Sequence, residues 1–278
     1  MSHEDGVLKD YLREMRPWQW YKAIIVFAGP FFTGKILELN IPKLILTFLS
    51  FCFVASSIYV INDIKDAERD RLHPKKKNRP IASGRISRKN ALLFATFLLL
   101  LSILFSSFVG IMVLGAVLFY FLLFILYTFY LKKLAVVDAF IIATGYLIRA
   151  LAGCWATSIE ITPWFYLVIF TFAVYLAFSK RFTEVKLAEK SHKESLEEYT
   201  KIVEMGIAIS ASSTFALYAL YSMQKDSLVY TVPLALLGMM LHLRETAKGK
   251  EVHEILKVPE VALTFLGFLL LVFYLLYL

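Results

Sequence analysis

Between Ala91 and Leu131 the chain runs for 41 residues without a charged side chain. At about 20 apolar residues per membrane span, this stretch is long enough for two helices, and we expect a tight turn between them near Gly110. The whole chain is 59% hydrophobic, whereas soluble domains are about 45–50% apolar. The sequence therefore predicts an all-α, polytopic membrane protein.

The same length criterion predicts nine transmembrane helices in one integral-membrane domain covering residues 1–278. The first is short and is interrupted by Pro30. The predicted spans are about Trp20–Thr33, Pro42–Ile61, two within Ala91–Leu131, Ala135–Trp155, Trp164–Ser179, Ile202–Met223, Tyr230–Leu243 and Val261–Leu278.

The distribution of basic residues predicts the orientation of these spans. Nearly all Lys and Arg residues lie before the first span or after spans two, four, six and eight, and the opposite side offers only Lys35, Lys43 and Lys225. Because cytoplasmic loops of membrane proteins are enriched in Lys and Arg, the N-terminus and the large loops should be cytoplasmic. The net charge of +8 then reflects topology, and no nucleic-acid-binding motif accompanies it.

A ladder of acids follows the second predicted span directly, in the segment NDIKDAERDRLHPKKKNRPIASGR from Asn62 to Arg85. If the helix continues, Asp63, Asp66 and Asp70 fall on one stripe that is about 10 Å long. Three neighbouring carboxylates repel one another unless a cation joins them, and hard oxygen ligands suit Mg²⁺. Three acids in register so close to a membrane span more often belong to a functional site than to a helix end that is merely solvated.

Basic residues come immediately after the acids, and they suggest that a diphosphate binds together with the metal. On their own they are more typical of an ordinary cytoplasmic loop. The cluster consists of Arg71, Lys75, Lys76, Lys77, Arg79 and Arg85.

The loop after the sixth span is basic where it begins, SKRFTE, at residues 179–184. Lys180 and Glu184 share a helical face, and Lys180 and Arg181 lie where a phosphate could be held at the membrane boundary. We expect the loops after spans two and six to face each other, as a metal-binding half and an anion-binding half. The alternative is a positive anchor with a surface ion pair.

Two further candidates are Lys22 and Arg149. Lys22 belongs to RPWQWYK at the start of the first span, where tryptophans are also ordinary interface residues. Arg149 lies deep in the fifth span, almost three turns from Asp138 and about 16 Å away along the helix. A buried Arg needs a partner or an anionic ligand, and an ion pair with another helix would also satisfy it.

These motifs resemble the UbiA superfamily of intramembrane prenyltransferases, through the nine spans, the two cytoplasmic loops and the NDxxDxxxD motif at Asn62–Asp70. The segment SKRFTE stands where UbiA-type enzymes usually carry a second aspartate motif. The chain is therefore most similar to the decaprenyl-phosphate phosphoribosyltransferase branch. The matching segments are RPWQWYK, NDIKDAERDRLHPKKKNRPIASG, LKKLAVVDAF, GYLIRALAG and SKRFTE, and KGKEVHEILKVPEVAL matches only loosely.

This resemblance implies transfer of 5-phosphoribose from phosphoribosyl diphosphate (PRPP) to a polyprenyl phosphate in a bacterial inner membrane, for synthesis of cell-envelope polysaccharide. It implies that Asp63, Asp66 and Asp70 hold Mg²⁺, or Mn²⁺, on the diphosphate, and that Asn62 orients a ligand or a water. The substrate-binding set is then Lys22, Asn62, Lys77, Arg79, Arg149, Lys180, Arg181 and Glu184.

Two other functions are compatible with the pattern. A UbiA-type enzyme that uses a prenyl diphosphate donor and a small or aromatic acceptor should have an acidic second loop. A transporter could line a path with Asp138 and Arg149, but it should carry polar residues at several mid-membrane positions. The oligomeric state is not encoded in any of these features.

Overall fold

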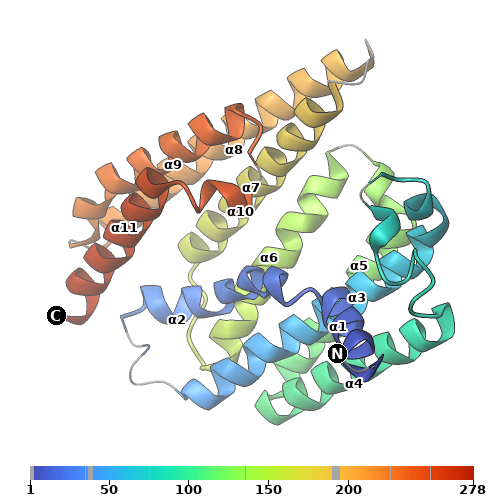
Figure 1. The fold of residues 1–278 in the computed structure, drawn as a ribbon. Coiled ribbons are helices and arrows are strands. Elements are labelled where there is room, and N and C mark those ends of the chain that lie inside the picture. Colours follow the sequence, from blue (N-terminus) through green and yellow to red (C-terminus); the bar gives the residue numbers. More distant parts are fainter. Residues whose placement is uncertain are drawn as a thin grey trace. The chain divides into compact units, whose positions relative to one another are not determined.

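The computed structural model describes residues 3–34, 36, 40–74, 76–134, 136–189, 195–225, 227–250 and 252–278, and the regular elements of these residues are all helices (Figure 1). Eight of these helices are long and apolar enough to cross a membrane. The all-α membrane fold is therefore confirmed. The spanning segments are Ile41–Arg71, Arg88–Val109, Ile111–Phe129, Val137–Ala156, Pro163–Lys186, Tyr199–Met223, Leu228–Ala247 and Pro259–Tyr277.

The first predicted span, Trp20–Thr33, is not among these eight helices. Its residues form a 3-10 helix, η1 (Pro17–Phe27), and a short α-helix, α2 (Ala28–Phe32). Pro30 has no N–H to donate and is tolerated only in the first turn of an α-helix, which is where α2 places it. The described residues thus contain eight candidate spans, and the predicted count of nine is not confirmed.

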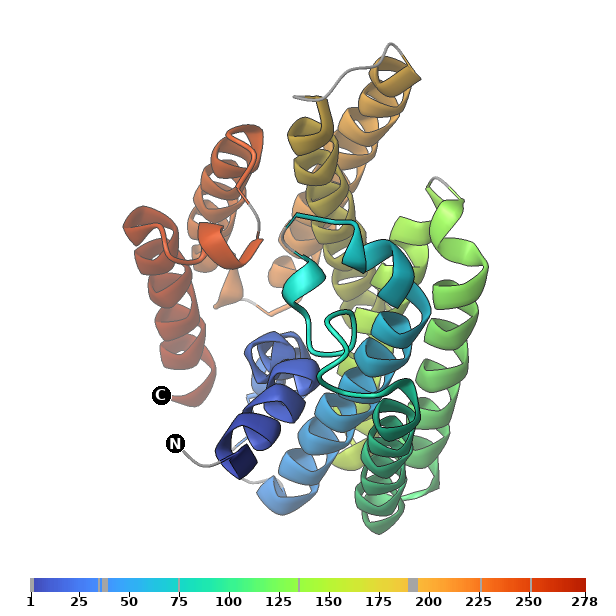
Figure 2. The same ribbon diagram turned by 45° about the vertical axis from the view of Figure 1, so that its right-hand side comes forward.

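The chain divides into two compact units, and the first consists of Met1–Ala28, Leu39–Lys132 and Ile148–Ile159. Its central helix, α3 (Ile41–Arg71), packs against α4 (Arg88–Val109), α5 (Ile111–Phe129), η1 and α1 (His3–Met15), as Figures 1 and 2 show. Two serine hydroxyls join α3 and α4: Ser57 donates to the carbonyl of Ala95 (2.8 Å), and Ser102 donates to that of Ser50 (2.7 Å). Small hydroxyl residues of this kind allow membrane helices to approach closely.

Local sequence explains where the helices of this unit begin and end. Asn40 caps α3 by accepting a hydrogen bond from the Lys43 N–H, and Ser87 caps α4 through the Asn90 N–H. Helix α3 continues without a break through the acidic residues as far as Arg71, as the sequence predicts. Gly110 joins α4 to α5 with a φ of 150°, a conformation that glycine adopts readily, so the expected turn is present.

The second unit consists of Gly29–Glu38, Lys133–Leu147 and Glu160–Leu278. Within it α7 (Pro163–Glu189) packs along α8 (Ser195–Met223), and α9 (Val232–Ala247) packs against α11 (Pro259–Tyr277). The core between α7 and α8 includes Ala173, Phe178, Val203 and Ile207. Helix α6 (Val137–Ala156) contributes to both units.

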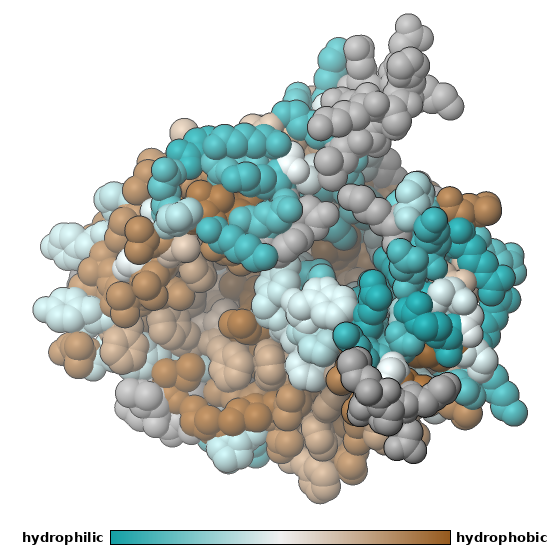
Figure 3. Space-filling model, in the orientation of Figure 1, coloured by the Kyte–Doolittle hydropathy of each residue, from teal (hydrophilic) through white to brown (hydrophobic). Residues whose placement is uncertain are grey.

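The apolar surface of the second unit fits a lipid environment. In the candidate span Leu228–Ala247, which contains α9, only 17% of the most apolar stretch is buried. In α11 the corresponding share is 11%. In Figure 3 the surface around these two helices is largely brown, whereas teal residues gather around α10 (Val252–Ile255), which follows α9. Exposed apolar area of this extent is stable when hydrocarbon covers it.

Gly153 of α6 is expected to tolerate no side chain. A Cβ at this position would lie 1.8 Å from the backbone oxygen of Val26 in η1, and overpacking usually costs about 1–3 kcal/mol. We expect Gly153→Ala to lower the thermal unfolding temperature of the purified protein. Gly115→Ala in α5 is the matched control, because nothing lies within 4 Å of its Cβ position, and equal unfolding temperatures for the two variants would contradict the prediction.

Candidate functional site

The acids of α3 are each paired with a basic side chain of the first unit. Asp63 and Asp70 are 2% exposed, and a single nitrogen of Arg79, Nη1, lies 2.9 Å from Asp63 Oδ1 and 2.7 Å from Asp70 Oδ2. Arg16 also forms an ion pair with Asp63. Two carboxylates seven residues apart thus converge on one position occupied by positive charge.

Asp66 turns to a different partner. Its carboxylate accepts hydrogen bonds of 3.0 and 3.2 Å from Lys132 Nζ, in η4 (Leu131–Lys133). The predicted ladder is therefore divided into a pair, Asp63 and Asp70, and a separate Asp66. Among the described residues no three His, Cys, Asp or Glu side chains gather into a group that could hold a metal.

Asp63 and Asp70 nevertheless fit a divalent cation. Mg²⁺ is usually held by one or two carboxylates together with waters and substrate phosphates, so three protein carboxylates are not required. The Arg79 nitrogen marks a point that both carboxylates reach. A metal that joined Asp63 to Asp70 would take the place of this guanidinium group, which would then be released to pair with an anion.

Glu14, at the end of α1, is a buried acid beside the aspartates. It is 2% exposed, and its Oε1 accepts a hydrogen bond of 3.1 Å from the Ile81 N–H. Burial, followed by the negative charge of Asp63 and a hydrogen bond with it, raises the pKa of Glu14 from 4.5 to about 7. Glu14 therefore links α1 to both Asp63 and the loop that carries Arg79.

The raised pKa of Glu14 predicts a pH-dependent stability. The folded protein binds the Glu14 proton more tightly than the unfolded chain does, so the free energy of unfolding should fall as pH rises from about 4.5 to about 7. We expect Glu14→Gln to flatten this dependence, because the amide is neutral and its oxygen can still accept from Ile81. Thermal unfolding at several pH values in this range measures the effect.

Glu14→Ala is the companion variant. It removes the acceptor as well as the proton, and leaves the Ile81 N–H buried without its partner, which costs about 1–3 kcal/mol. It should therefore be less stable than Glu14→Gln at every pH. A Glu14→Gln variant with the pH dependence of the unchanged protein would exclude Glu14 as the titrating group.

The other predicted residues of the first unit are more dispersed. Asn62 is half-buried on α3, and Lys77 is exposed in η3 (Lys76–Asn78). Lys22 is half-buried in η1, with its ammonium 5.9 Å from the centre of the Tyr21 ring. Lys75 lies outside the described residues. The roles of these side chains in substrate binding stay predictions.

Arg149 contacts two aromatic residues of the first unit. It is 4% exposed and donates a 2.5 Å hydrogen bond to the Tyr120 hydroxyl. Its guanidinium also lies 4.5 Å from the centre of the Tyr120 ring and 6.0 Å from that of Phe51. Aromatic faces attract a guanidinium group, so these contacts stabilise a cation that the sequence places deep in the membrane.

Asp138 has a different partner, and this partner belongs to the second predicted loop. Asp138 is buried, and its Oδ2 lies 2.5 Å from Arg181 Nε. Arg181 also pairs with Glu184, and Lys180 Nζ lies 3.6 Å from Glu184. Lys180, Arg181 and Glu184 therefore lie together in the second unit, with Asp138 as an additional acid. That they bind a phosphate stays a prediction.

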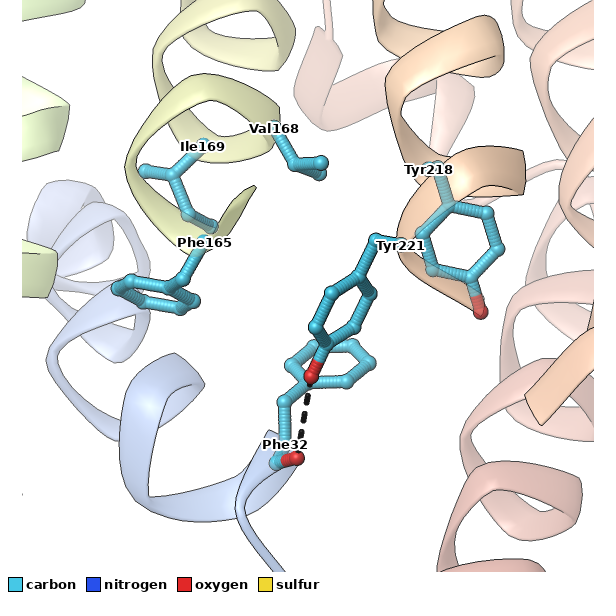
Figure 4. Close-up of a pocket in the computed structure, with 6 residues that line it drawn as sticks. All are labelled: Phe32, Phe165, Val168, Ile169, Tyr218 and Tyr221. Carbon is cyan, nitrogen blue, oxygen red and sulfur yellow. Dashed lines mark hydrogen bonds between the residues drawn. The ribbon is translucent and has the colours of Figure 1, made fainter. Parts of the chain in front are cut away.

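An apolar pocket lies near the other end of α7, within the second unit (Figure 4). The Tyr221 hydroxyl reaches the backbone oxygen of Phe32 at 3.5 Å beside it. Phe165 of this pocket is 15 residues from Lys180, which is about 22 Å along a helix. The pocket is thus remote from the charged groups of α7. It is lined by Phe32, Phe165, Val168, Ile169, Tyr218 and Tyr221.

The sequence model described as the UbiA prenyltransferase family matches residues 23–254. The chain belongs to this family. The decaprenyl-phosphate phosphoribosyltransferase of Mycolicibacterium smegmatis is 35% identical to this UbiA-family chain over 230 residues, covering 80% of this chain and 72% of that one. The enzyme of the same name from Corynebacterium glutamicum is 36% identical over 204 residues, covering 70% and 60%.

The fold of this UbiA-family chain also resembles a solved structure. A UbiA homologue from Archaeoglobus fulgidus, described as bound to DMAPP and Mg²⁺, superposes with a TM-score of 0.74. The match covers 96% of this chain and 99% of the homologue at 20% identity. This similarity identifies the fold.

Sequence reasoning missed Glu14 and Lys132 as partners of the acids in this UbiA-family chain, and it included Arg16 only within the segment RPWQWYK. Arg16 and Glu14 lie 47 residues from Asp63 and 67 residues from Ile81, respectively, so no local periodicity connects these pairs. The available signal was weak: a Glu and an Arg close before the first apolar segment.

Proposed function

We propose that this protein transfers 5-phosphoribose from PRPP to a polyprenyl phosphate and releases diphosphate. The observation that carries the proposal is the convergence of Asp63 and Asp70 on the Arg79 guanidinium, together with basic residues at SKRFTE. The first arrangement suits a metal-bound diphosphate, and the second suits a phosphate bound without metal. The names of the two curated relatives support the same reaction.

In the proposed reaction, an oxygen of the lipid phosphate bonds to C1 of the ribose while the bond from C1 to the diphosphate oxygen breaks. Mg²⁺, or Mn²⁺, on Asp63 and Asp70 would neutralise charge on the departing diphosphate. Arg79 and Arg16, displaced from the carboxylates, would pair with the same anion through charge-assisted hydrogen bonds. Asp66 and Lys132 would keep the end of α3 fixed against η4.

The remaining phosphate groups require cations but no base. Lys180 and Arg181 would bind the 5-phosphate of the donor. The acceptor is a phosphate monoester with a second pKa of about 6, so it is already an anion at neutral pH. The reaction therefore needs no strong general base to activate the acceptor.

The test is a transfer assay with purified protein in nanodiscs. PRPP labelled in the ribose should pass its label into lipid when polyprenyl phosphate and Mg²⁺ are present, and not when either is omitted. A parallel reaction offers a labelled prenyl diphosphate and an aromatic acceptor. Transfer of the prenyl group with no use of PRPP would overturn the proposal and favour an ordinary prenyltransferase.

The proposal places the charged ends of the spans in the cytoplasm, where PRPP is made. We expect Lys77→Cys to resist a membrane-impermeant thiol reagent in intact cells and Lys225→Cys to react. The native Cys52 and Cys154 are buried and give a low background. The reverse labelling pattern would contradict this orientation.

A further inference from the structure

Glu245, at the end of α9, is a buried carboxylate surrounded by three basic side chains. It is 1% exposed. Its Oε1 accepts from Arg244 Nε at 2.9 Å and from Lys248 Nζ at 2.5 Å, and its Oε2 lies 2.7 Å from Lys250 Nζ. We call Arg244, Lys248 and Lys250 the α9 basic cluster. One acid thus orders three cations over seven residues.

The backbone of this segment is also fixed. The Thr183 hydroxyl donates to the carbonyl of Lys250 at 3.1 Å, and Lys186 Nζ donates to the carbonyl of Ala247. Gly249 has a φ of 81°, which allows the chain to turn between the two lysines. The segment is therefore held against α7, and its cations do not have the freedom of a solvated loop.

The α9 basic cluster has more donors than Glu245 can use. Each ammonium group carries three N–H donors and a guanidinium carries five, whereas Glu245 offers two oxygens. Arg244 makes a second ion pair, with Glu260 at the start of α11. The side chains of Lys248 and Lys250 remain 54% and 40% exposed, so both ammonium groups are accessible to an anion from outside.

The position of the cluster selects the kind of anion. It lies where the candidate span Leu228–Ala247 ends and just before the span Pro259–Tyr277 begins. The teal surface near α10 in Figure 3, beside the brown surface of α9 and α11, marks the same boundary. Phosphate groups of lipids lie at this level of a bilayer. Scattered cytoplasmic lysines are common, but they do not normally converge on a buried carboxylate.

We propose that the α9 basic cluster binds a phosphate group carried by a lipid. Glu245 is a positioning residue that orients Lys248 and Lys250, and their outward N–H groups contact the phosphate oxygens. Two lipids carry this chemistry, the polyprenyl phosphate and an anionic phospholipid. The binding does not depend on the proposed transfer reaction.

The test measures binding without turnover. Protein in phosphatidylcholine nanodiscs is titrated with polyprenyl phosphate, with phosphatidylglycerol and with inorganic phosphate, and bound lipid is counted by native mass spectrometry. We expect Lys248→Gln and Lys250→Gln each to raise the Kd of polyprenyl phosphate or of phosphatidylglycerol about tenfold, because each substitution removes a charge-assisted hydrogen bond. Glu245→Gln should weaken it as well, since the lysines lose their anchor.

Lys257→Gln is the matched control. Lys257 is an exposed residue of the same connection between α9 and α11, so this variant removes the same charge without touching Glu245. Lys248→Gln leaves the Arg244 and Lys250 pairs of Glu245 intact, so it should fold, and its unfolding temperature verifies this.

The outcomes separate the possibilities. A loss for polyprenyl phosphate alone identifies the acceptor lipid as the occupant, and a loss for phosphatidylglycerol identifies bulk anionic lipid. Unchanged binding of both lipids in Lys248→Gln and Lys250→Gln would overturn the proposal. An equal loss in Lys257→Gln would also overturn it, because diffuse positive charge would then explain the binding. If inorganic phosphate competes as well as either lipid, the claim of a lipid site is wrong.

Discussion

Replacing Asp63 with Asn should lower phosphoribosyl transfer at least a hundredfold, which corresponds to about 3 kcal/mol of transition-state stabilisation. Asp63 is buried and contacts both Arg16 and Arg79, so the amide would lose the charge that holds either a metal or these cations. Asp70→Asn should behave similarly, because Asp70 shares Arg79. The measurement is turnover at saturating PRPP over a titration of Mg²⁺.

Glu68→Gln is the control for this experiment. Glu68 lies on the same helix, but its side chain is 79% exposed and pairs with Arg88, and exposed pairs of this kind contribute little. Its turnover should stay within about twofold of the unchanged protein. Asp66→Asn should also lower turnover, because it weakens the contact with Lys132 that holds the end of α3, and normal turnover in that variant would remove Asp66 from the functional set. An Asp63→Asn variant that remains folded and fully active would refute the proposed role of the pair.

Arg181→Ala should produce the largest loss of stability among the basic variants. Asp138 is buried against Arg181, and removing one partner of a buried pair costs about 3–5 kcal/mol because the other charge remains unpaired. Asp138→Asn should restore much of this loss in the double variant. Thermal unfolding of the two single variants and the double variant gives the coupling energy, and simple additivity would contradict a buried pair.

Lys180→Ala isolates the functional part of the same region. Lys180 is 49% exposed and its ion pair with Glu184 is long at 3.6 Å, so this substitution should leave the unfolding temperature unchanged. We expect the KM for PRPP to rise about ten- to a hundredfold through the loss of a charge-assisted contact. The Mg²⁺ requirement should change far less. A normal KM for PRPP would remove Lys180 from the phosphate-binding residues.

The features that were predicted from sequence depend on local patterns. The continuation of α3 through Asp63 and Asp70, the turn at Gly110 and the pairing of Lys180 with Glu184 follow from helical spacing and glycine conformation. The first span was predicted to be short and interrupted by Pro30, but its division into a 3-10 helix and a short α-helix was not predicted, because hydropathy does not distinguish such a segment from a continuous helix. Pro30 was the sequence feature that indicated an interruption of the helix.

The partners of the acids were harder to predict, because the tertiary fold determines which of several basic residues pairs with each acid. The basic run that follows the three aspartates offered six residues, and only Arg79 bridges two carboxylates among those that the structure describes. Glu245 illustrates the same limit. An acid in a basic segment is normally read as a solvated charge, and only its burial against Lys248 and Lys250 indicates that it organises them.

The contacts of α1 affect how the protein should be handled. Glu14 and Arg16 connect the first helix and the residue after it to Ile81 and Asp63, so removing the polar segment before the first apolar segment would remove the Arg16 partner of Asp63 and the Glu14 acceptor of the Ile81 N–H. Truncated variants should therefore keep α1 and Arg16 intact.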